Sequence, residues 1–141
     1  MAAVRETLGD IESLTFQEDG AGPDGESGET AIRPELIGDA IIGRKDVGTS
    51  YHLAVTYDDA LQGITLVTRG QDLYFATPFH LMLQKLLDLP QPDYHHHRLI
   101  LDDDGKRLAK SAQSKAIRAW RDAGSTPEDV FKEISWTAPN T

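Results

Sequence analysis

The stretch of sequence that decides the fold runs from Gly48 to Leu73 and reads GTSYHLAVTYDDALQGITLVTRGQDL. Its first half predicts a helix, because four of its residues recur at helical spacing. These residues are Tyr51, Ala54, Val55 and Asp58. Gly63 ends the helical pattern, and the β-branched run of residues 64–68 predicts a buried strand. A second helical pattern follows Arg69, so the stretch reads as helix, buried strand, charged tip and helix.

The charged tip of the predicted strand is a candidate ligand site. In an open α/β sheet, ligands bind just past the carboxyl ends of the strands. Arg69 offers a planar set of hydrogen-bond donors there, which suits a carboxylate or a phosphate. The residue types alone also allow a plainer interpretation, in which Arg69 is a surface ion-pair partner and Tyr51 is a core aromatic.

Length, composition and charge bound the class of protein. The chain has 141 residues, enough for one hydrophobic core, and no cysteine, which excludes disulfides and thiolate zinc sites. No apolar run reaches membrane-spanning length and the first residues lack a signal pattern, so we expect a cytoplasmic protein without a membrane partner.

The charge distribution points to one localised basic segment. The net charge is −9, which argues against a general nucleic-acid coat. Residues 106–121 hold six basic residues and no acidic one, whereas residues 1–32 hold eight acidic residues and one arginine. This segment fits a localised phosphate site, and its plainer interpretation is a solvated helix face.

Several shorter elements are expected around the central stretch. Residues 18–30 read as an acidic loop and residues 40–43 as a strand entering the core. Thr77 and Pro78 are typical of a helix N-cap with proline at the first helical position. An apolar stripe then predicts a helix packed on the sheet, formed by Phe79, Met82, Leu83, Leu86 and Leu87.

The last part of the chain predicts a strand and two helices. Residues 98–101 read as a buried strand closed by an acidic turn. One helix contains Ala116, Ile117 and Trp120 and ends at Gly124. A second helix begins at Thr126 with a proline and acidic residues in its first turn, and its apolar residues are expected to be buried. These apolar residues are Val130, Phe131 and Ile134.

Three consecutive histidines, His95 to His97, raise the question of a metal site. In an extended chain His95 and His97 share a face and His96 points away, so at most two of them converge. Neither an acidic residue nor a cysteine lies beside them at a spacing typical of zinc. We therefore expect no metal site there.

The central stretch resembles the second half of the catalytic domain of glutamyl-tRNA synthetases, and above all their shortened relatives, the glutamyl-Q tRNA(Asp) synthetases. The pattern Tyr-x-Leu-Ala-Val, then Asp-Asp-Ala-x-x-Gly-Val-Thr, then Val-Val-Arg-Gly-x-Asp-Leu is nearly the sequence of residues 51–73. Val55 stands where discriminating glutamyl-tRNA synthetases often have asparagine, which favours the glutamyl-Q branch.

A second motif resembles the Lys-Met-Ser-Lys-Ser signature loop of class I aminoacyl-tRNA synthetases. It consists of Arg107, Leu108, Ala109, Lys110 and Ser111. A lysine on such a loop acts as a point charge for triphosphate oxygens when an amino acid is activated with ATP. It follows the strand and helix after Arg69, in the order that the family shows.

The resemblance implies an α/β fold, the second half of a class I synthetase Rossmann-like catalytic domain with short C-terminal helices. Residues 1–37 would be the acidic, loop-rich end of a connective insert, and residues 38–141 the C-terminal half of the catalytic domain. By resemblance Tyr51 and Arg69 hold the substrate glutamate and Lys110 contacts ATP, which brings magnesium as its companion ion. The implied function is ATP-dependent activation of glutamate and its transfer to tRNA, with no zinc.

One family signature is absent from the sequence. No histidine is followed by Gly-His, so the His-Ile-Gly-His motif of the first Rossmann half does not occur. We expect family chemistry only when the other half is supplied, and self-association or a partner chain that covers the exposed sheet. The alternative is a non-catalytic remnant that keeps a nucleotide or tRNA contact.

Overall fold

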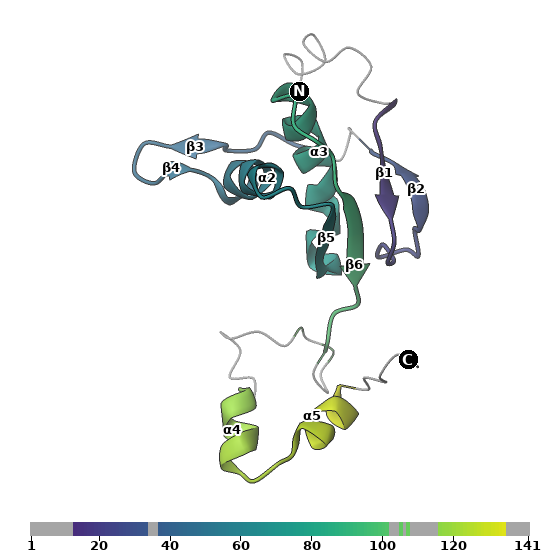
Figure 1. Cartoon of the computed structure of the whole chain (residues 1–141), viewed down its shortest axis with the longest axis vertical. Helices are drawn as coiled ribbons and strands as arrows, with labels where there is room; N and C mark the ends of the chain where they lie inside the picture. Colours follow the sequence, from purple (N-terminus) through teal and green to yellow (C-terminus); the bar gives the residue numbers. More distant parts are fainter. Residues whose placement is uncertain (1–12, 34–36, 102–104, 106, 108–115, 135–141) are drawn as a thin grey trace. The chain divides into compact units, whose positions relative to one another are not determined.

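A computed structural model describes residues 13–33, 37–101, 105, 107 and 116–134 of the chain. The chain divides into two compact units, Met1–Arg98 and Leu99–Thr141 (Figure 1). The domain boundary expected after residue 37 stays a prediction about the family's insert. Within the described ranges, no helix has the length and apolar character that crossing a membrane requires.

The first unit is built on a four-stranded sheet with the order β2-β1-β6-β5. Its strands are β1 (Thr15–Glu18), β2 (Gly28–Ala31), β5 (Leu66–Gly70) and β6 (Asp93–His97). The first two form an antiparallel hairpin, whereas β6 runs parallel to both β1 and β5. The mixed sheet with its helices confirms the predicted α/β class.

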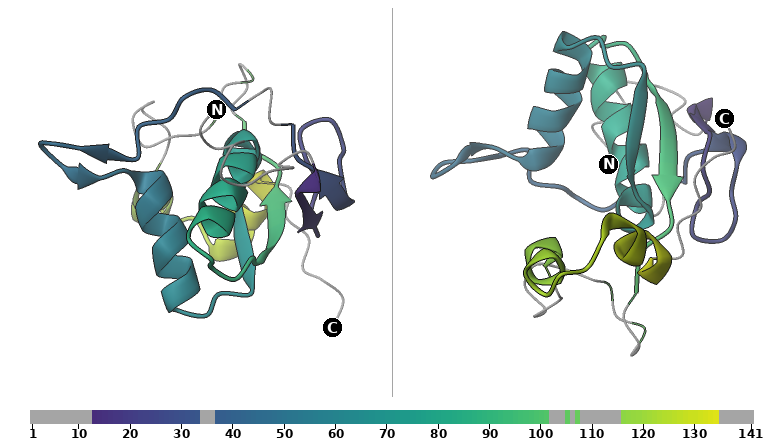
Figure 2. Two further views of the ribbon diagram at one scale, coloured as in Figure 1. Left: turned by 90° about the horizontal axis from the view of Figure 1, so that it is seen from above. Right: turned by 60° about the horizontal axis from the view of Figure 1, so that its bottom comes forward.

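The helices of this unit are α2 (Tyr51–Leu61), the 3-10 helix η3 (Gln71–Ala76) and α3 (Thr77–Leu86). The Ser50 side chain caps α2 by accepting a hydrogen bond from the backbone N–H of Leu53 at 3.3 Å. Gly63 follows the end of α2 with a φ of +67°, a conformation that favours glycine. The predicted helix and its stop are thereby confirmed. Figure 2 shows α2 and α3 lying against each other beside β6.

The core of the first unit joins the β1–β2 hairpin to α3 and β6. Phe16 lies at its centre and makes edge-to-face contacts with Tyr74 and Tyr94, with ring centroids 6.0 and 5.6 Å apart. The buried apolar residues of this cluster are Phe16, Ile32, Ile37, Tyr74, Leu81, Met82 and Tyr94. The hairpin is therefore an integral part of the fold, and the expectation of a loop over residues 18–30 holds only for the residues between its two strands.

The predicted strand after α2 was misplaced by two residues. It begins at Leu66 instead of residue 64, and the side chain of Leu66 is exposed. Because side chains alternate along a strand, Val67 and Arg69 share the inward face, and Arg69 is the buried residue of β5. Arg69 is thus a member of the strand, and the interpretation of it as a surface ion-pair partner is wrong.

Two other strand predictions were also wrong. The apolar run at residues 98–101 lies outside β6, because the parallel pairing with β5 extends from Asp93 to His97 instead. Ile41 and Ile42 do not enter the core but are exposed. The strand beside them is β3 (Gly43–Arg44), which forms a small antiparallel pair with β4 (Gly48–Thr49).

Helix α3 departs from its predicted form at both ends. Thr77 is the first residue of the helix instead of its N-cap, and its hydroxyl accepts a hydrogen bond from the side chain of Arg69. At the other end Leu86 and Leu87 are exposed, whereas Met82 and Leu83 are buried as predicted. The buried face also includes His80 and Gln84, two polar residues that the apolar stripe did not identify.

The second unit contains α4 (Ile117–Asp122) and α5 (Pro127–Glu133). Gly124 follows α4 with a φ of +82°, as expected of a helix end, and Thr126 begins α5 with a capping box that uses Asp129. The prediction that the apolar residues of α5 are buried was wrong, because α5 contains no buried residue and Phe131 is exposed.

Candidate functional site

A cluster of polar side chains lies at the carboxyl ends of β5 and β6. Arg69 and His96 are paired residues of these parallel strands, each one position before the strand ends. The first turns of α2 and α3 also lie at this cluster. His52 of α2 and His80 of α3 contact each other there, with Nδ1 of His52 2.9 Å from Nε2 of His80. This end of a parallel pair and the positive ends of helix dipoles both favour anionic ligands.

Arg69 is the centre of the cluster and is only 8% exposed. Its Nε donates a hydrogen bond to Nε2 of His96 at 3.0 Å, and one terminal nitrogen donates to Nδ1 of His80 at 2.9 Å. The other terminal nitrogen donates to the hydroxyl of Thr77. Because a guanidinium carries five N–H groups, these partners leave two of them for another acceptor.

The charge state of the two histidines follows from their contacts. Each ring accepts a hydrogen bond from Arg69, which requires an unprotonated nitrogen, so both imidazoles are neutral. Burial, Arg69 and His52 lower the pKa of His80 to about 3. Burial also lowers the pKa of His96, against the opposing effect of Glu18. In the described part of the chain, Arg69 therefore has no charged hydrogen-bond partner.

Glu18 reaches the cluster from the β1–β2 hairpin through His96. Its Oε2 lies 2.5 Å from Nδ1 of His96, and both side chains are fully buried. Because the carboxylate only accepts, Nδ1 carries the imidazole proton. Tyr94 completes the cluster, with its ring 5.0 Å from the Arg69 guanidinium carbon and stacked on the His96 ring at 6.1 Å.

The electrostatics of Arg69 mark it as an unusual buried cation. Burial lowers its pKa, while Tyr94, Tyr51, Asp59 and Glu18 oppose this effect at longer range. Burial raises the pKa of Asp59, against the opposing effect of Arg69. A buried charge without a directly bound counter-ion is costly, and such perturbed groups concentrate at functional sites.

Of the residues predicted from the sequence, Tyr51 and Arg69 both contact His80. The Tyr51 ring centroid lies 6.3 Å from that of His80, which itself contacts Arg69. Tyr51 is 54% exposed, so its interpretation as a core aromatic is wrong. Arg107 forms an isolated bridge with Leu101. Residues 108–111 of the signature loop, with Lys110, lie outside the described residues.

Reasoning from the sequence missed five members of the cluster: Glu18, His52, Thr77, His80 and Tyr94. His96 was considered only as a metal ligand. In the described ranges there is no group of three or more acidic, histidine or cysteine residues that could hold a metal ion, and the absence of zinc stays a prediction. The alternation of Tyr94 with His96 was the available signal, since it places both on one face of β6.

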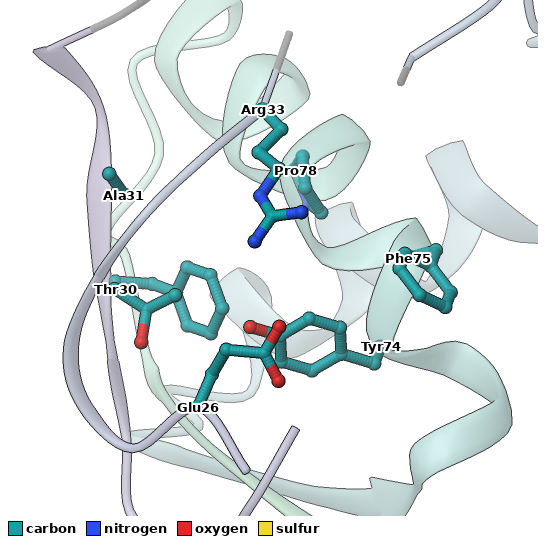
Figure 3. Close-up of a pocket in the computed structure, with 8 residues that line it drawn as sticks. Glu26, Thr30, Ala31, Arg33, Tyr74, Phe75 and Pro78 are labelled. Atoms are coloured by element: carbon teal, nitrogen blue, oxygen red, sulfur yellow. The ribbon is translucent and has the colours of Figure 1, made fainter. Parts of the chain in front are cut away.

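A separate small pocket lies between the hairpin and η3 (Figure 3). It has a volume of about 60 Å³ and is lined by Phe16, Glu26, Thr30, Ala31, Arg33, Tyr74, Phe75 and Pro78. Burial, together with Glu26 and Glu18, raises the pKa of Tyr74 to about 12, so its hydroxyl stays protonated. Neither Arg69 nor any of its hydrogen-bond partners lines this pocket.

Comparison with known proteins decides the family. A sequence model of the catalytic domain of class I tRNA synthetases (E and Q) matches residues 16–137. The chain belongs to this synthetase family. The cluster around Arg69 is therefore part of a synthetase catalytic domain.

Two similar proteins show how much of a synthetase this chain covers. The glutamyl-Q tRNA(Asp) synthetase of Rhodobacter capsulatus is 52% identical in an alignment 107 residues long, which covers 73% of this chain and 38% of that protein. The glutamate–tRNA ligase 2 of Alkalilimnicola ehrlichii is 41% identical over 108 residues, which are 77% of this chain and 23% of that protein. The chain thus spans less than half the length of the synthetases it matches.

Among solved structures, the fold resembles that of a glutamate tRNA ligase from Elizabethkingia meningosepticum, crystallised in complex with its amino acid. The TM-score is 0.57 at 24% sequence identity, over 70% of this chain and 18% of that chain. The likeness agrees with the α/β fold of a synthetase catalytic domain.

Gly20 gives a first test of how the synthetase cluster is supported. A Cβ added there would lie 2.4 Å from the backbone oxygen and 2.8 Å from the backbone nitrogen of His96. We expect Gly20→Ala to lower the free energy of unfolding by about 1–3 kcal/mol, because the backbone of β6 must shift. Urea denaturation measures this. Gly38→Ala, where a Cβ meets open space, is the control, and equal stability of the two variants would contradict the prediction.

Proposed function

We propose that this chain carries the glutamate-holding part of a site that activates glutamate with ATP for transfer to tRNA. The single observation that supports this most is Arg69, a buried guanidinium whose hydrogen-bond partners in the described chain are all neutral. A carboxylate that accepts its remaining N–H groups would give the buried charge a counter-ion. Tyr51, exposed beside the same cluster, would position the substrate.

The remaining parts of the proposal rest on the family. Lys110 of the signature loop would contact ATP, and magnesium would accompany the nucleotide. The high identity to a protein named glutamyl-Q tRNA(Asp) synthetase, together with Val55, favours transfer to the queuosine base of tRNA(Asp). The activity requires further catalytic residues, which a second half or a partner chain would supply.

The test is glutamate binding and glutamate-dependent ATP–pyrophosphate exchange by the purified chain. Arg69→Gln removes the charge but keeps a polar side chain, so we expect glutamate binding to weaken by about a hundredfold, a loss typical of a buried charge pair. Arg44→Gln is the matched control, since the Arg44 side chain is 61% exposed and pairs with the neighbouring Asp46. It should bind glutamate as the unchanged chain does.

The outcomes separate the two parts of the proposal. Exchange that disappears in Arg69→Gln and persists in Arg44→Gln supports the full activity. Binding without exchange supports the glutamate-holding role alone, with the chemistry supplied elsewhere. A folded chain that does not bind glutamate would overturn the proposal.

Association with another chain belongs to the same proposal. In the described sheet β5 is an edge strand, and Leu66 and Ile64 expose apolar surface beside it. Such an edge pairs readily with another strand. We expect light scattering to report a mass above that of a monomer at high concentration, reduced by Leu66→Lys, which places a charge on the edge. A compact monomer at every concentration would argue against association.

A further inference from the structure

The pair formed by Glu18 and His96 is fully buried and tightly constrained. Oε1 of Glu18 accepts hydrogen bonds from the backbone N–H groups of His96 and Gly20, each at 2.9 Å. Oε2 faces Nδ1 of His96. With Oε1 committed to two backbone donors, the orientation of the carboxylate is fixed, and with it the tautomer of the imidazole.

The consequence reaches Arg69. Because Nδ1 of His96 holds the proton, Nε2 carries a lone pair that accepts from Nε–H of Arg69 at 3.0 Å, and the Thr77 hydroxyl lies 3.3 Å from the same nitrogen. Tyr94 stacks on the same imidazole with an interplanar angle of 7° and also lies against the guanidinium. The ring plane of His96 and the direction of the guanidinium are therefore set together.

We propose that Glu18 and His96 are a positioning pair that aims Arg69 at the ligand carboxylate, with the imidazole holding the Glu18 charge away from the guanidinium. A carboxylate bound directly to Arg69 would occupy the N–H groups that the ligand needs. The neutral imidazole of His96, which lies between Glu18 and Arg69, orients the guanidinium without occupying the N–H groups that bind the ligand. This inference rests on the proposed function, since it assigns the ligand of Arg69 as the carboxylate of glutamate.

Glu18→Gln is the sharpest variant, because it keeps the shape of the side chain. The two backbone N–H groups hold the amide oxygen where Oε1 stands now, so the amide NH₂ must face Nδ1 of His96. Nδ1 must then accept, and the imidazole proton moves to Nε2, where it opposes Nε–H of Arg69. The guanidinium loses one of its three hydrogen-bond acceptors and keeps those at His80 and Thr77, although the substituted residue does not touch the ligand.

The experiment combines nitrogen-15 NMR of the histidine rings and arginine side chains with glutamate titration. In the unchanged chain we expect His96 to be protonated on Nδ1 alone and the Arg69 Nε–H to be protected from exchange. In Glu18→Gln we expect the proton on Nε2, rapid exchange of the Arg69 Nε–H, and glutamate binding weakened on the order of tenfold, the lower end of the loss seen when groups that orient metal-binding histidines are removed. Glu29→Gln, on the exposed side of the same hairpin, should change none of these.

Each result decides the proposal. A His96 ring protonated on Nε2 in the unchanged chain overturns it without any variant, so a failure of Glu18→Gln to fold does not block the test. A folded Glu18→Gln variant that binds glutamate within twofold of the unchanged chain also overturns it. If the unchanged chain does not bind glutamate, the proposed function fails, and the His96 tautomer and Arg69 exchange then decide whether the pair positions Arg69.

Discussion

Tyr94→Ala is expected to unfold the first unit under conditions in which Tyr57→Ala leaves it intact. Tyr94 is 1% exposed and lies between the apolar core and the polar cluster, whereas Tyr57 is 53% exposed. The ring of Tyr94 contacts Phe16 on one side, and His96 and Arg69 on the other. Its hydroxyl accepts a hydrogen bond from Gln84 at 3.0 Å.

Removing this ring combines several losses. A large buried aromatic replaced by alanine costs about 3–5 kcal/mol through lost transfer energy and the cavity left behind. The buried amide NH₂ of Gln84 would also lose its acceptor, the Tyr94 hydroxyl, and Oε1 of Gln84 already has no partner in the described chain. Since small domains are stable by about 5–15 kcal/mol, a loss of this size removes most of the margin.

Urea denaturation followed by circular dichroism measures the effect, with the midpoint and slope compared among the three proteins. Tyr57→Ala should change the free energy of unfolding by about 0.5 kcal/mol or less, as at most exposed positions. Two variants with equal midpoints would show that Tyr94 is not the connection between the core and the cluster.

The second large effect is a loss of stability in mild acid. The pKa of His80 in the folded chain lies near 3, because burial and the charge of Arg69 oppose protonation, whereas an unfolded histidine has a pKa of 6.5. Between these values the unfolded chain binds a proton that the folded chain does not, so stability is full above pH 6.5 and falls as the pH falls. His80 alone should cost about 2 kcal/mol between pH 6.5 and 5, and His96, whose pKa is also lowered, adds to the loss.

The pH dependence can be assigned with one variant. His80→Asn keeps a polar side chain that can accept from Arg69 but does not titrate, so the loss of stability between pH 6.5 and 5 should become smaller. His97→Asn, at an exposed position of β6, should leave it unchanged. Urea midpoints at a series of pH values measure both. Identical pH profiles of the unchanged chain and His80→Asn would show that another group causes the acid sensitivity.

The sequence predicts those elements whose signals are local. Helix α2 begins at a capping serine and stops before a glycine with positive φ, and both signals stand next to the element they define. The α5 capping box is another such case. In the second unit, however, the burial of the apolar residues of α5 was predicted wrongly, because an apolar stripe does not say what packs against it.

The cluster around Arg69 lies beyond local signals. Glu18 and His96 are 78 residues apart and meet only because β1 pairs with β6. The position of β6 was missed because the apolar residues 99–101 outweighed the histidines before them. In the fold the histidine segment forms β6, because Arg69 and Glu18 give the buried His96 the hydrogen-bond partners that it requires.

The placement of Glu18 on the β1–β2 hairpin has a thermodynamic consequence. When the hairpin separates from β6, the carboxylate leaves His96 and the backbone N–H of His96 loses its acceptor, whereas Gly20, on the same hairpin as Glu18, keeps it. Local opening of this hairpin and release of a carboxylate from Arg69 are then linked equilibria. A ligand that needs the oriented guanidinium must also hold the hairpin closed, and the slowing of hydrogen exchange at the His96 amide would measure its affinity.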